Sequence, residues 1–461
     1  MHIHILGICG TFMAGVAAIA RSAGHRVTGS DQGVYPPMSD QLADLGIDIV
    51  EGYGVDQLGL NPDVVIIGNV MMRGMPIIEA VLNRKLAYTS GPEWLAREVL
   101  AGRRVAAVAG THGKTTTASL LAWILEFAGQ QPGFLIGGVP RNFSQSARLG
   151  EGDVFVIEAD EYDTAFFDKR AKFLHYHPDT QIIGNIEFDH ADIYANLEAI
   201  QWQFHQLLRT LPGNGHLIVP AGSRNVDALL AMGCWTPVET FSSAADEAAD
   251  WRAAAGGDGS LVVTERESQA ERQCQWSMPG AHNAENALAA LLAARHLGVD
   301  PDRSLQALAA FKGVKRRLEL RGNIGGVEVY DDFAHHPTAI RKTIEGLRSA
   351  EAGGRLLVAL EPRSNTMRLG HHRDTLAAAL TGADAVWVYE PPDLQWDLKA
   401  AMSGGGVTVS SDVENIVDGL TQTANPQDRI IIMSNGGFDG IHARVERALE
   451  KKFAPTESTA V

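Results

Sequence analysis

Hydrophobic residues fall into short apolar runs that alternate with longer stretches of helical periodicity. In the N-terminal part this pattern predicts three strands, at residues 2–7, 25–31 and 63–69, and an Ala-rich helix at residues 14–24. The turn after the first strand carries Gly7 and Gly10 but does not complete the pattern G-x-G-x-x-G. We therefore expect a Rossmann-like unit with only a weak dinucleotide signal.

The same alternation of strands and helices occurs twice more. The middle of the chain predicts small antiparallel strands within 242–272, strands at 104–110, 154–160, 181–186 and 216–220, and helices at 115–129, 196–211 and 284–298. The C-terminal part predicts strands at 327–332, 355–362, 385–390, 407–410 and 429–437. Such alternation indicates mostly parallel sheets covered by helices. The fold class is therefore α/β in three domains, 1–103, 104–319 and 320–461.

Composition limits the classes of protein to consider. Of the 461 residues, 45% are hydrophobic and 20% are charged, which is typical of a globular protein. No apolar run has the length of about 20 residues that a membrane span needs. The net charge of -16 argues against a nucleic-acid-binding protein, which needs clustered Lys and Arg. Three distant cysteines and an N-terminus without a basic leader indicate a cytoplasmic protein.

Residues 109–117, AGTHGKTTT, follow an apolar strand and resemble a phosphate-binding loop. The common pattern G-x-x-x-x-G-K-[ST] has a glycine where this chain has Val108, and Gly110 makes the loop two residues shorter. The Gly-Lys-Thr end is complete, so Lys114 can reach phosphate oxygens and Thr115 can ligate Mg²⁺. The alternative is a plain glycine-rich turn with an exposed lysine.

Two acidic clusters follow later strands, EADEYD at 158–163 and NIEFDHAD at 185–192. In an open α/β sheet both would lie at the edge that presents the loop. Because carboxylates this close together repel one another, a cation among them is expected, with Glu158 and His190 as its ligands. The alternatives are a solvated acidic turn and a purely structural histidine.

Three further motifs carry polar side chains that could contact a ligand. Asn283 and Asn286 lie three residues apart at a helix start, where they either cap the helix or present amides to a base. Arg317 either binds phosphate as domains close or belongs to a solvated basic turn. Asp332 and His335 precede a helix, and because His335 and the next histidine would point apart, substrate contact is favoured over joint metal ligation.

In order along the chain, GTHGKTT, EADEYD, NIEFDHAD, HNAEN, RRLE and DDFAHHPT resemble the motifs of the Mur ligase family. These ATP-dependent enzymes form peptide bonds on UDP-N-acetylmuramate precursors. The resemblance covers essentially the whole chain, from GICGTFM to MSNGGFDGIH. YPPMSDQL, FLIGGVP, EADEYDTAFFDKR and LEPRSNTMRLG are similar to the branch that attaches the recycled tripeptide L-alanyl-γ-D-glutamyl-meso-diaminopimelate. Branches that add D-glutamate or later residues have a carbamylated lysine where this chain has His205.

The resemblance implies a ligation through an acyl phosphate, with ATP as co-substrate and Mg²⁺ as cofactor. It implies catalytic roles for Lys114, Glu158, His190 and Arg317, and metal ligation by Thr115, Glu158 and His190. The implied ATP-binding residues are Gly110, Thr111, His112, Gly113, Lys114, Thr115, Thr116, Asn283, Asn286, Arg317 and Asp332. We expect the UDP sugar to bind at Gly10, Ser30, Asp31 and Asn69. For the peptide we expect His335, Arg363, Asn365 and Asn435, with Arg363 on a carboxylate.

Several alternatives stay open. A ligase that adds L-alanine would perform the same chemistry on a smaller amine, whereas a folylpolyglutamate-type ligase is disfavoured by the added N-terminal unit. A nucleotide-regulated binding protein that has lost ligation belongs to a different class. We expect a monomer or weak homodimer without nucleic-acid or membrane partners, with a role in cell-wall biogenesis and thereby in cell shape, the cell cycle and cell division.

Overall fold

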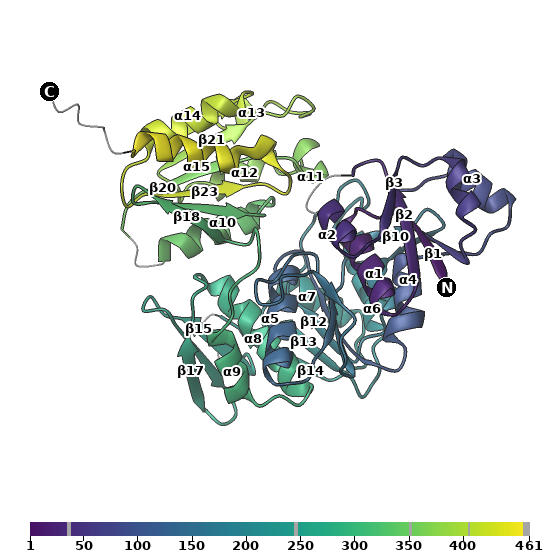
Figure 1. The fold of residues 1–461 in the computed structure, drawn as a ribbon. Helices are drawn as coiled ribbons and strands as arrows, with labels where there is room; N and C mark the ends of the chain where they lie inside the picture. Colours follow the sequence, from purple (N-terminus) through teal and green to yellow (C-terminus); the bar gives the residue numbers. More distant parts are fainter. Residues whose placement is uncertain (35–37, 244–247, 350–352, 404–405, 455–461) are drawn as a thin grey trace.

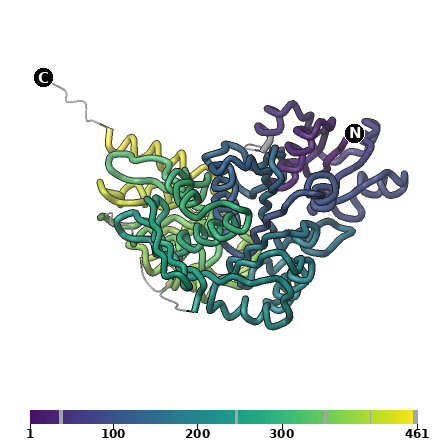
Figure 2. The backbone as a smooth tube through the Cα atoms, turned by 90° about the horizontal axis from the view of Figure 1, so that it is seen from below, coloured from purple at the N-terminus to yellow at the C-terminus, as the bar shows by residue number. Residues whose placement is uncertain are grey.

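The computed structural model describes residues 1–34, 38–243, 248–349, 353–403 and 406–454. The chain forms three lobes, each built on its own β-sheet (Figure 1). The N-terminal lobe, in purple, and the C-terminal lobe, in green and yellow, lie on opposite sides of the central lobe (Figure 2). No helix in the described ranges is long and apolar enough to cross a membrane.

The N-terminal sheet is entirely parallel, with strand order β3-β2-β1-β4-β5. Its strands are β1 (His2–Leu6), β2 (Arg26–Asp31), β3 (Asp48–Glu51), β4 (Val64–Ile67) and β5 (Tyr88–Ser90). Its α-helices are α1 (Thr11–Ser22), α2 (Met38–Asp44), α3 (Pro76–Asn83) and α4 (Gly91–Leu95). The three predicted strands are present, but α1 begins three residues earlier than predicted, because residues 11–13 form its first turn rather than a loop.

The central sheet has the order β17-β16-β15-β14-β13-β12-β6-β9-β7-β8. The strands are β6 (Arg104–Ala109), β7 (Gly133–Leu135), β8 (Ala147–Arg148), β9 (Val154–Glu158), β12 (Thr180–Ile183), β13 (His216–Pro220), β14 (Val238–Ser242), β15 (Trp251–Ala255), β16 (Ser260–Glu265) and β17 (Glu271–Gln275). Strands β15, β16 and β17 pair antiparallel, as predicted for this region. A separate hairpin consists of β10 (Asp163–Ala165) and β11 (Asp168–Ala171). The α-helices are α5 (Lys114–Phe127), α6 (Leu197–Leu208), α7 (Arg224–Ala231), α8 (Ala281–His296) and α9 (Pro301–Ala309).

The C-terminal sheet has the order β18-β19-β23-β20-β21-β22 and is parallel except for the edge strand β18. Its strands are β18 (Glu319–Ile324), β19 (Val327–Asp332), β20 (Leu356–Leu360), β21 (Ala385–Tyr389), β22 (Val407–Ser410) and β23 (Arg429–Met433). Its α-helices are α10 (Pro337–Ser349), α11 (Asn365–Arg368), α12 (Arg373–Ala379), α13 (Leu398–Ala401), α14 (Val413–Thr423) and α15 (Ile441–Lys452). The five predicted strands are present, while β18 was not predicted, because it is polar and mostly solvent-accessible.

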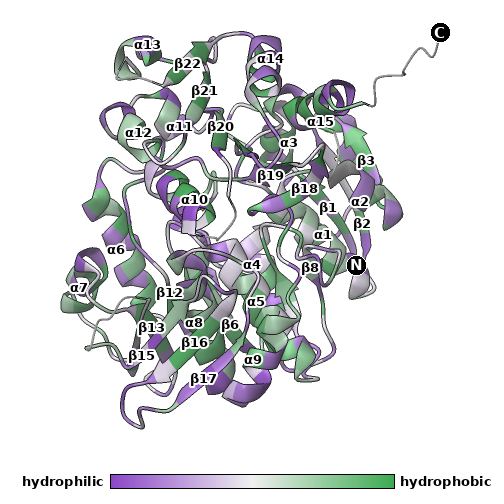
Figure 3. Ribbon diagram, turned by 90° about the vertical axis from the view of Figure 1, so that its left-hand side faces the viewer, coloured by the Kyte–Doolittle hydropathy of each residue, from purple (hydrophilic) through white to green (hydrophobic). Residues whose placement is uncertain are grey.

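In each lobe the strands of the sheet are mostly apolar, and the helices around them carry polar residues (Figure 3). Strands β1, β9, β12, β20 and β23 are buried along their whole length, as expected for parallel strands covered on both faces. In the central lobe β12, β6 and β9 are neighbours and run parallel. Their carboxyl ends therefore present the loops that follow them at one edge of the sheet.

Candidate active site

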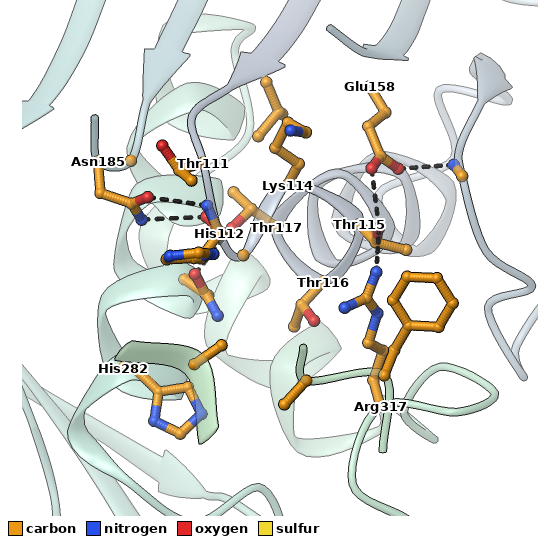
Figure 4. Close-up of a pocket in the computed structure, with 18 of the residues that line it drawn as sticks. Thr111, His112, Lys114, Thr115, Thr116, Thr117, Glu158, Asn185, His282 and Arg317 are labelled. Carbon is orange, nitrogen blue, oxygen red and sulfur yellow. Dashed lines mark hydrogen bonds between the residues drawn. The ribbon is translucent and has the colours of Figure 1, made fainter. Parts of the chain in front are cut away.

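The loop between β6 and α5 has the backbone of a phosphate-binding turn. Gly110 and Gly113 have φ angles of 139° and 82°, in the region that favours glycine. A Cβ atom on Gly113 would lie 2.6 Å from Oδ1 of Asn286. The side chain of Asn185 braces the loop, since it accepts a hydrogen bond from the His112 amide (2.8 Å) and donates one to the His112 carbonyl (3.0 Å; Figure 4). The loop is therefore held at His112, and its last glycine leads directly into α5.

Lys114 is buried at the first position of α5, with a side chain only 10% exposed. Its Nζ donates to the Gly110 carbonyl (2.8 Å) and to Glu161 Oε2 (2.9 Å), and lies 3.5 Å from Asp160 Oδ1. Burial alone would lower the pKa of this ammonium, but Glu161 and Asp160 outweigh it and raise the pKa. The alternative of an exposed lysine on a plain turn is therefore wrong.

Thr115 and Glu158 form a second polar group beside the loop. Thr115 Oγ1 donates to Glu158 Oε1 (2.8 Å), Gly137 N donates to Glu158 Oε2 (2.6 Å), and Arg317 Nη2 donates to Thr115 Oγ1 (3.0 Å; Figure 4). Burial and the neighbouring Asp160 raise the pKa of Glu158. The Thr115 hydroxyl and the Glu158 carboxylate are both buried. Both are oxygen ligands, the type that hard cations prefer.

His190 belongs to a different pair from Glu158. Its Nε2 lies 2.9 Å from Glu161 Oε1, and its backbone amide donates to Asp189 Oδ1 (2.7 Å). Burial tends to raise the pKa of Glu161, but Lys114 and His190 lower it to about 2. The predicted metal set thus divides into Thr115 with Glu158 and His190 with Glu161. Glu161 was not among the predicted residues, although it lies in the EADEYD motif.

Another group of possible metal ligands joins the central and C-terminal lobes. His112, Glu187 and His336 offer ligand atoms within 4.8 Å of one another. However, His336 Nδ1 accepts a hydrogen bond from the Thr338 amide (3.2 Å), and Glu187 Oε2 accepts one from the Thr338 hydroxyl (2.6 Å). Because Glu187 and His336 both bond to Thr338, we assign the group a role in the contact between the two lobes.

Three cavities meet at this edge of the central sheet. The central cavity, of about 370 Å³, lies over the loop. Most of the residues predicted to bind ATP and metal line it, namely Thr111, His112, Gly113, Lys114, Thr115, Thr116, Glu158, His190, Asn283, Asn286, Arg317 and Asp332. Gly110 is not part of the lining and instead binds Lys114 through its carbonyl.

The two asparagines and Asp332 are tied to the protein within the central cavity. Asn283 donates to the Pro279 carbonyl (2.7 Å), and Asn286 accepts from Thr117 Oγ1 (3.1 Å). The N-cap of α8 is Gly280, so the interpretation of these asparagines as caps is wrong. Asp332 accepts from the amides of Leu318 (2.7 Å) and Ala334 (2.9 Å), and burial raises its pKa.

The N-terminal cavity, of about 400 Å³, lies beside the turn between β1 and α1. Gly10, Asp31 and Asn69 line it, whereas Ser30 is fully buried and does not. The Asp31 carboxylate holds the turn in place by accepting a hydrogen bond from the Cys9 amide (2.9 Å). Ser30 contributes through its backbone carbonyl, which accepts from Gly7 N (2.8 Å).

The C-terminal cavity, of about 290 Å³, contains all four residues predicted for the peptide: His335, Arg363, Asn365 and Asn435. Asn435 Oδ1 is buried without a hydrogen-bond partner in the described structure. Tyr162 lines this cavity as well as the central and N-terminal cavities. The three spaces therefore converge at Tyr162, whose position sequence reasoning did not single out.

Comparisons with known proteins agree with this arrangement. The chain matches the Mur ligase family, catalytic domain over residues 2–103, the Mur ligase middle domain over 108–294, and the Mur ligase, glutamate ligase domain over 316–436. It is 51% identical to the UDP-N-acetylmuramate--L-alanyl-gamma-D-glutamyl-meso-2,6-diaminoheptandioate ligase of Escherichia coli K12, with 98% of this chain and 99% of that protein covered. A UDP-N-acetylmuramate--L-alanine ligase from Arthrobacter sp. is 37% identical over 84% of this chain and 80% of its own length. A solved murein peptide ligase from Psychrobacter arcticus 273-4 aligns with a TM-score of 0.75 and 47% identity, over 98% of this chain and 99% of that one.

Proposed function

The chain belongs to the Mur ligase family, and from this we propose that it joins UDP-N-acetylmuramate to the tripeptide L-alanyl-γ-D-glutamyl-meso-diaminopimelate at the expense of ATP. The observation that carries the proposal is the convergence of three cavities at Tyr162. One cavity suits each substrate: the N-terminal cavity the UDP sugar, the central cavity ATP, and the C-terminal cavity the peptide.

The reaction has two steps. An oxygen of the lactyl carboxylate attacks the γ-phosphorus of ATP, and ADP leaves with the electrons of the broken P–O bond. The amino nitrogen of the tripeptide then attacks the acyl carbon, loses a proton and expels inorganic phosphate. Both steps bring anions together, so cations around the central cavity must stabilise the transition states.

We assign the stabilising roles to residues that line the central cavity. Lys114 at the start of α5 is assigned to the β- and γ-phosphates, where ATP would compete with Glu161 and Asp160 for its ammonium. Arg317, from the segment that leads into the C-terminal lobe, is assigned to the ATP phosphates. Asn283 and Asn286 are assigned to the adenine and Asp332 to the ribose.

Mg²⁺ fits the donors that the cavity presents. Thr115 Oγ1 and Glu158 Oε1 lie 2.8 Å apart, and His190, whose Nε2 contacts Glu161 in the free protein, lines the same cavity. Bound by these residues, Mg²⁺ would neutralise phosphate charge. Its positive charge would also stabilise the ionised form of Glu158, which burial disfavours in the free protein.

The C-terminal cavity supports a peptide rather than L-alanine as the amine substrate. Arg363 provides a guanidinium for a carboxylate, and the unpartnered Asn435 Oδ1 can accept a hydrogen bond from an ammonium. Asn365 and His335 complete the lining. His205, which is buried between Trp202 and Trp235, separates the chain from the branches that add D-glutamate or later residues but does not distinguish a peptide from L-alanine.

The remaining expectations belong to the same proposal. We place the domain boundaries at 1–103, 104–319 and 320–461, and we infer a cytoplasmic enzyme of peptidoglycan recycling that acts as a monomer or weak homodimer. The three cysteines are free thiols, which is the state expected in a reducing compartment.

Phosphate release tests the function directly. With ATP, Mg²⁺ and UDP-N-acetylmuramate, we expect the tripeptide to give rapid release and L-alanine to give little. A higher kcat/KM with L-alanine would favour the L-alanine ligase. Release that does not depend on either amine, or no release at all, would support a nucleotide-regulated binding protein.

A further inference from the structure

Lys172 is a buried lysine that the assignments above leave unused. It follows the β10–β11 hairpin, which folds the chain back so that its amide donates to the Tyr162 carbonyl (2.9 Å). The residue is 8% exposed. Its Nζ lies 5.1 Å from the centre of the Phe12 ring and 5.5 Å from that of Tyr162. Within the described ranges, no carboxylate oxygen lies within the 4.0 Å of an ion pair.

A buried ammonium without an ion pair is unfavourable, because the two aromatic faces replace only part of its hydration. Burial lowers the pKa of Lys172, and the more distant carboxylates of Asp160 and Asp163 oppose this only in part. By contrast, Lys169 on the same hairpin is exposed and bonds Asp163 at 2.6 Å. An anionic ligand would therefore stabilise the ammonium of Lys172, which lacks an anionic partner in the free protein.

The position of Lys172 indicates which anion this is. Lys172 lines the N-terminal cavity, and its two aromatic neighbours, Phe12 and Tyr162, line both that cavity and the central one. The ammonium thus lies where a ligand would pass from one space to the other. Asp160 lines both cavities and Glu158 lines the central one, and these carboxylates would repel an anion that lacked a cation beside it.

The other cations of this region already have partners. Lys114 is bonded to Glu161, and Arg317 is bonded to Thr115. In the proposed function the diphosphate of the nucleotide is assigned to the turn before α1, where backbone amides and the helix N-terminus favour an anion. Among the described residues that line the N-terminal cavity, Lys172 is the one lysine or arginine, so it is the cation available there to an anionic group of the sugar.

We propose that Lys172 binds the lactyl carboxylate of the UDP sugar and holds it at the entrance to the central cavity, ready to attack ATP. This inference rests on the proposed function, because it takes UDP-N-acetylmuramate as the substrate. It adds a substrate-binding residue that contacts the reacting group itself. The charge of Lys172 would offset the repulsion between that carboxylate and the acidic wall.

Two UDP sugars separate the carboxylate from the rest of the ligand. UDP-N-acetylmuramate and UDP-N-acetylglucosamine differ only in the lactyl ether, so binding of both is measured by calorimetry on the full chain. For Lys172→Met we expect roughly 10- to 100-fold weaker binding of UDP-N-acetylmuramate, the loss typical of a charge-assisted hydrogen bond, and unchanged binding of UDP-N-acetylglucosamine. Lys172→Arg should restore most of the loss, and Lys169→Met is the matched control.

Thermal unfolding shows whether the variant folds. Without ligand, Lys172→Met should unfold at the same temperature as the wild type or above it, because an unpaired buried charge has been removed. Saturating UDP-N-acetylmuramate should then stabilise the wild type more than the variant.

Other outcomes overturn the inference. An equal loss for both sugars would place Lys172 on the diphosphate or in the fold, and no loss for either would show that it contacts no anion. In both cases normal phosphate release by the wild type would leave the proposed function intact. If the wild type itself releases no phosphate with all substrates present, or binds both sugars equally, the proposed function is wrong. The inference, which rests on it, is then wrong as well.

Discussion

Replacement of Lys114 by methionine tests the assignment of the loop most directly. Methionine keeps the apolar stem but removes the ammonium that binds the Gly110 carbonyl and Glu161. The change should impair both folding stability and catalysis, because Lys114 neutralises carboxylates in the free protein and is assigned to phosphates when ATP is bound.

The loss of stability can be estimated from the ion pair. The side chains of Lys114 and Glu161 are 10% and 3% exposed, and their atoms lie 2.9 Å apart. Removal of one partner from a buried pair costs about 3–5 kcal/mol. His190 still lies 2.9 Å from the other oxygen of Glu161 and offers partial compensation, so we expect about 3 kcal/mol. For a domain of this size that corresponds to a decrease in Tm of roughly 6–12 °C.

The assays are scanning fluorimetry of the full chain and phosphate release well below the Tm of the variant. We expect kcat/KM to fall at least about 10²- to 10³-fold, the range seen when one electrostatic contact to a transition state is lost. Binding of UDP-N-acetylmuramate should be retained, since the N-terminal cavity is not altered. Lys169→Met, which removes an exposed lysine paired with Asp163, should leave both Tm and turnover unchanged.

Two results would refute the reasoning. A Tm equal to that of the wild type would mean that Glu161 does not need the ammonium. Near wild-type turnover at a temperature where the variant is folded would mean that Lys114 does not act on the phosphates.

Three further predictions follow from single contacts. Gly113→Ala should lower the free energy of unfolding by about 1–3 kcal/mol and weaken ATP binding, because φ is 82° and the new Cβ would meet Asn286; unchanged ATP affinity by calorimetry would contradict this. Arg363→Met should raise KM for the tripeptide roughly tenfold and leave KM for ATP unchanged, and steady-state kinetics showing an equal change in both would argue against a peptide contact. Asp428→Asn should destabilise the C-terminal lobe at pH 7. Burial opposes ionisation of Asp428, but the hydrogen bond from Arg355 outweighs it and lowers the pKa of Asp428 below its usual 3.8. The stabilisation is therefore present above pH 3.8 and is lost as the pH falls through the lowered pKa. Urea unfolding that gives the same difference between wild type and variant at pH 7 and pH 3 would count against the last prediction.

The sequence was sufficient for the architecture because parallel strands in this protein are buried on both faces. Such strands appear as continuous apolar runs, and β13 was predicted with the bounds that the structure has. Short or polar strands such as β3, β5 and β18 lack this signal and were missed. Their pairing depends on neighbouring strands rather than on their own side chains.

Local motifs also predicted most of the lining of the site, because the loops after β6, β9 and β12 meet at one sheet edge. The partners within the site could not be predicted in the same way. His190 pairs with Glu161 rather than lying beside Glu158, and Ser30 lies behind the N-terminal cavity rather than in it. These outcomes depend on side-chain directions that sequence spacing does not determine.

The sequence by itself thus determined the phosphate-binding loop, the order of the three α/β units and the family motifs, since each rests on residues close together in the chain. Only the tertiary structure decided that three cavities from three lobes converge at Tyr162 and that Lys172 lies buried between Phe12 and Tyr162, with no ion pair to another described residue. Phe12 and Lys172 are far apart in the sequence, so their contact follows from the packing of two lobes. The burial that makes the lysine a site for an anion is a property of that packing and has no signature in either segment alone.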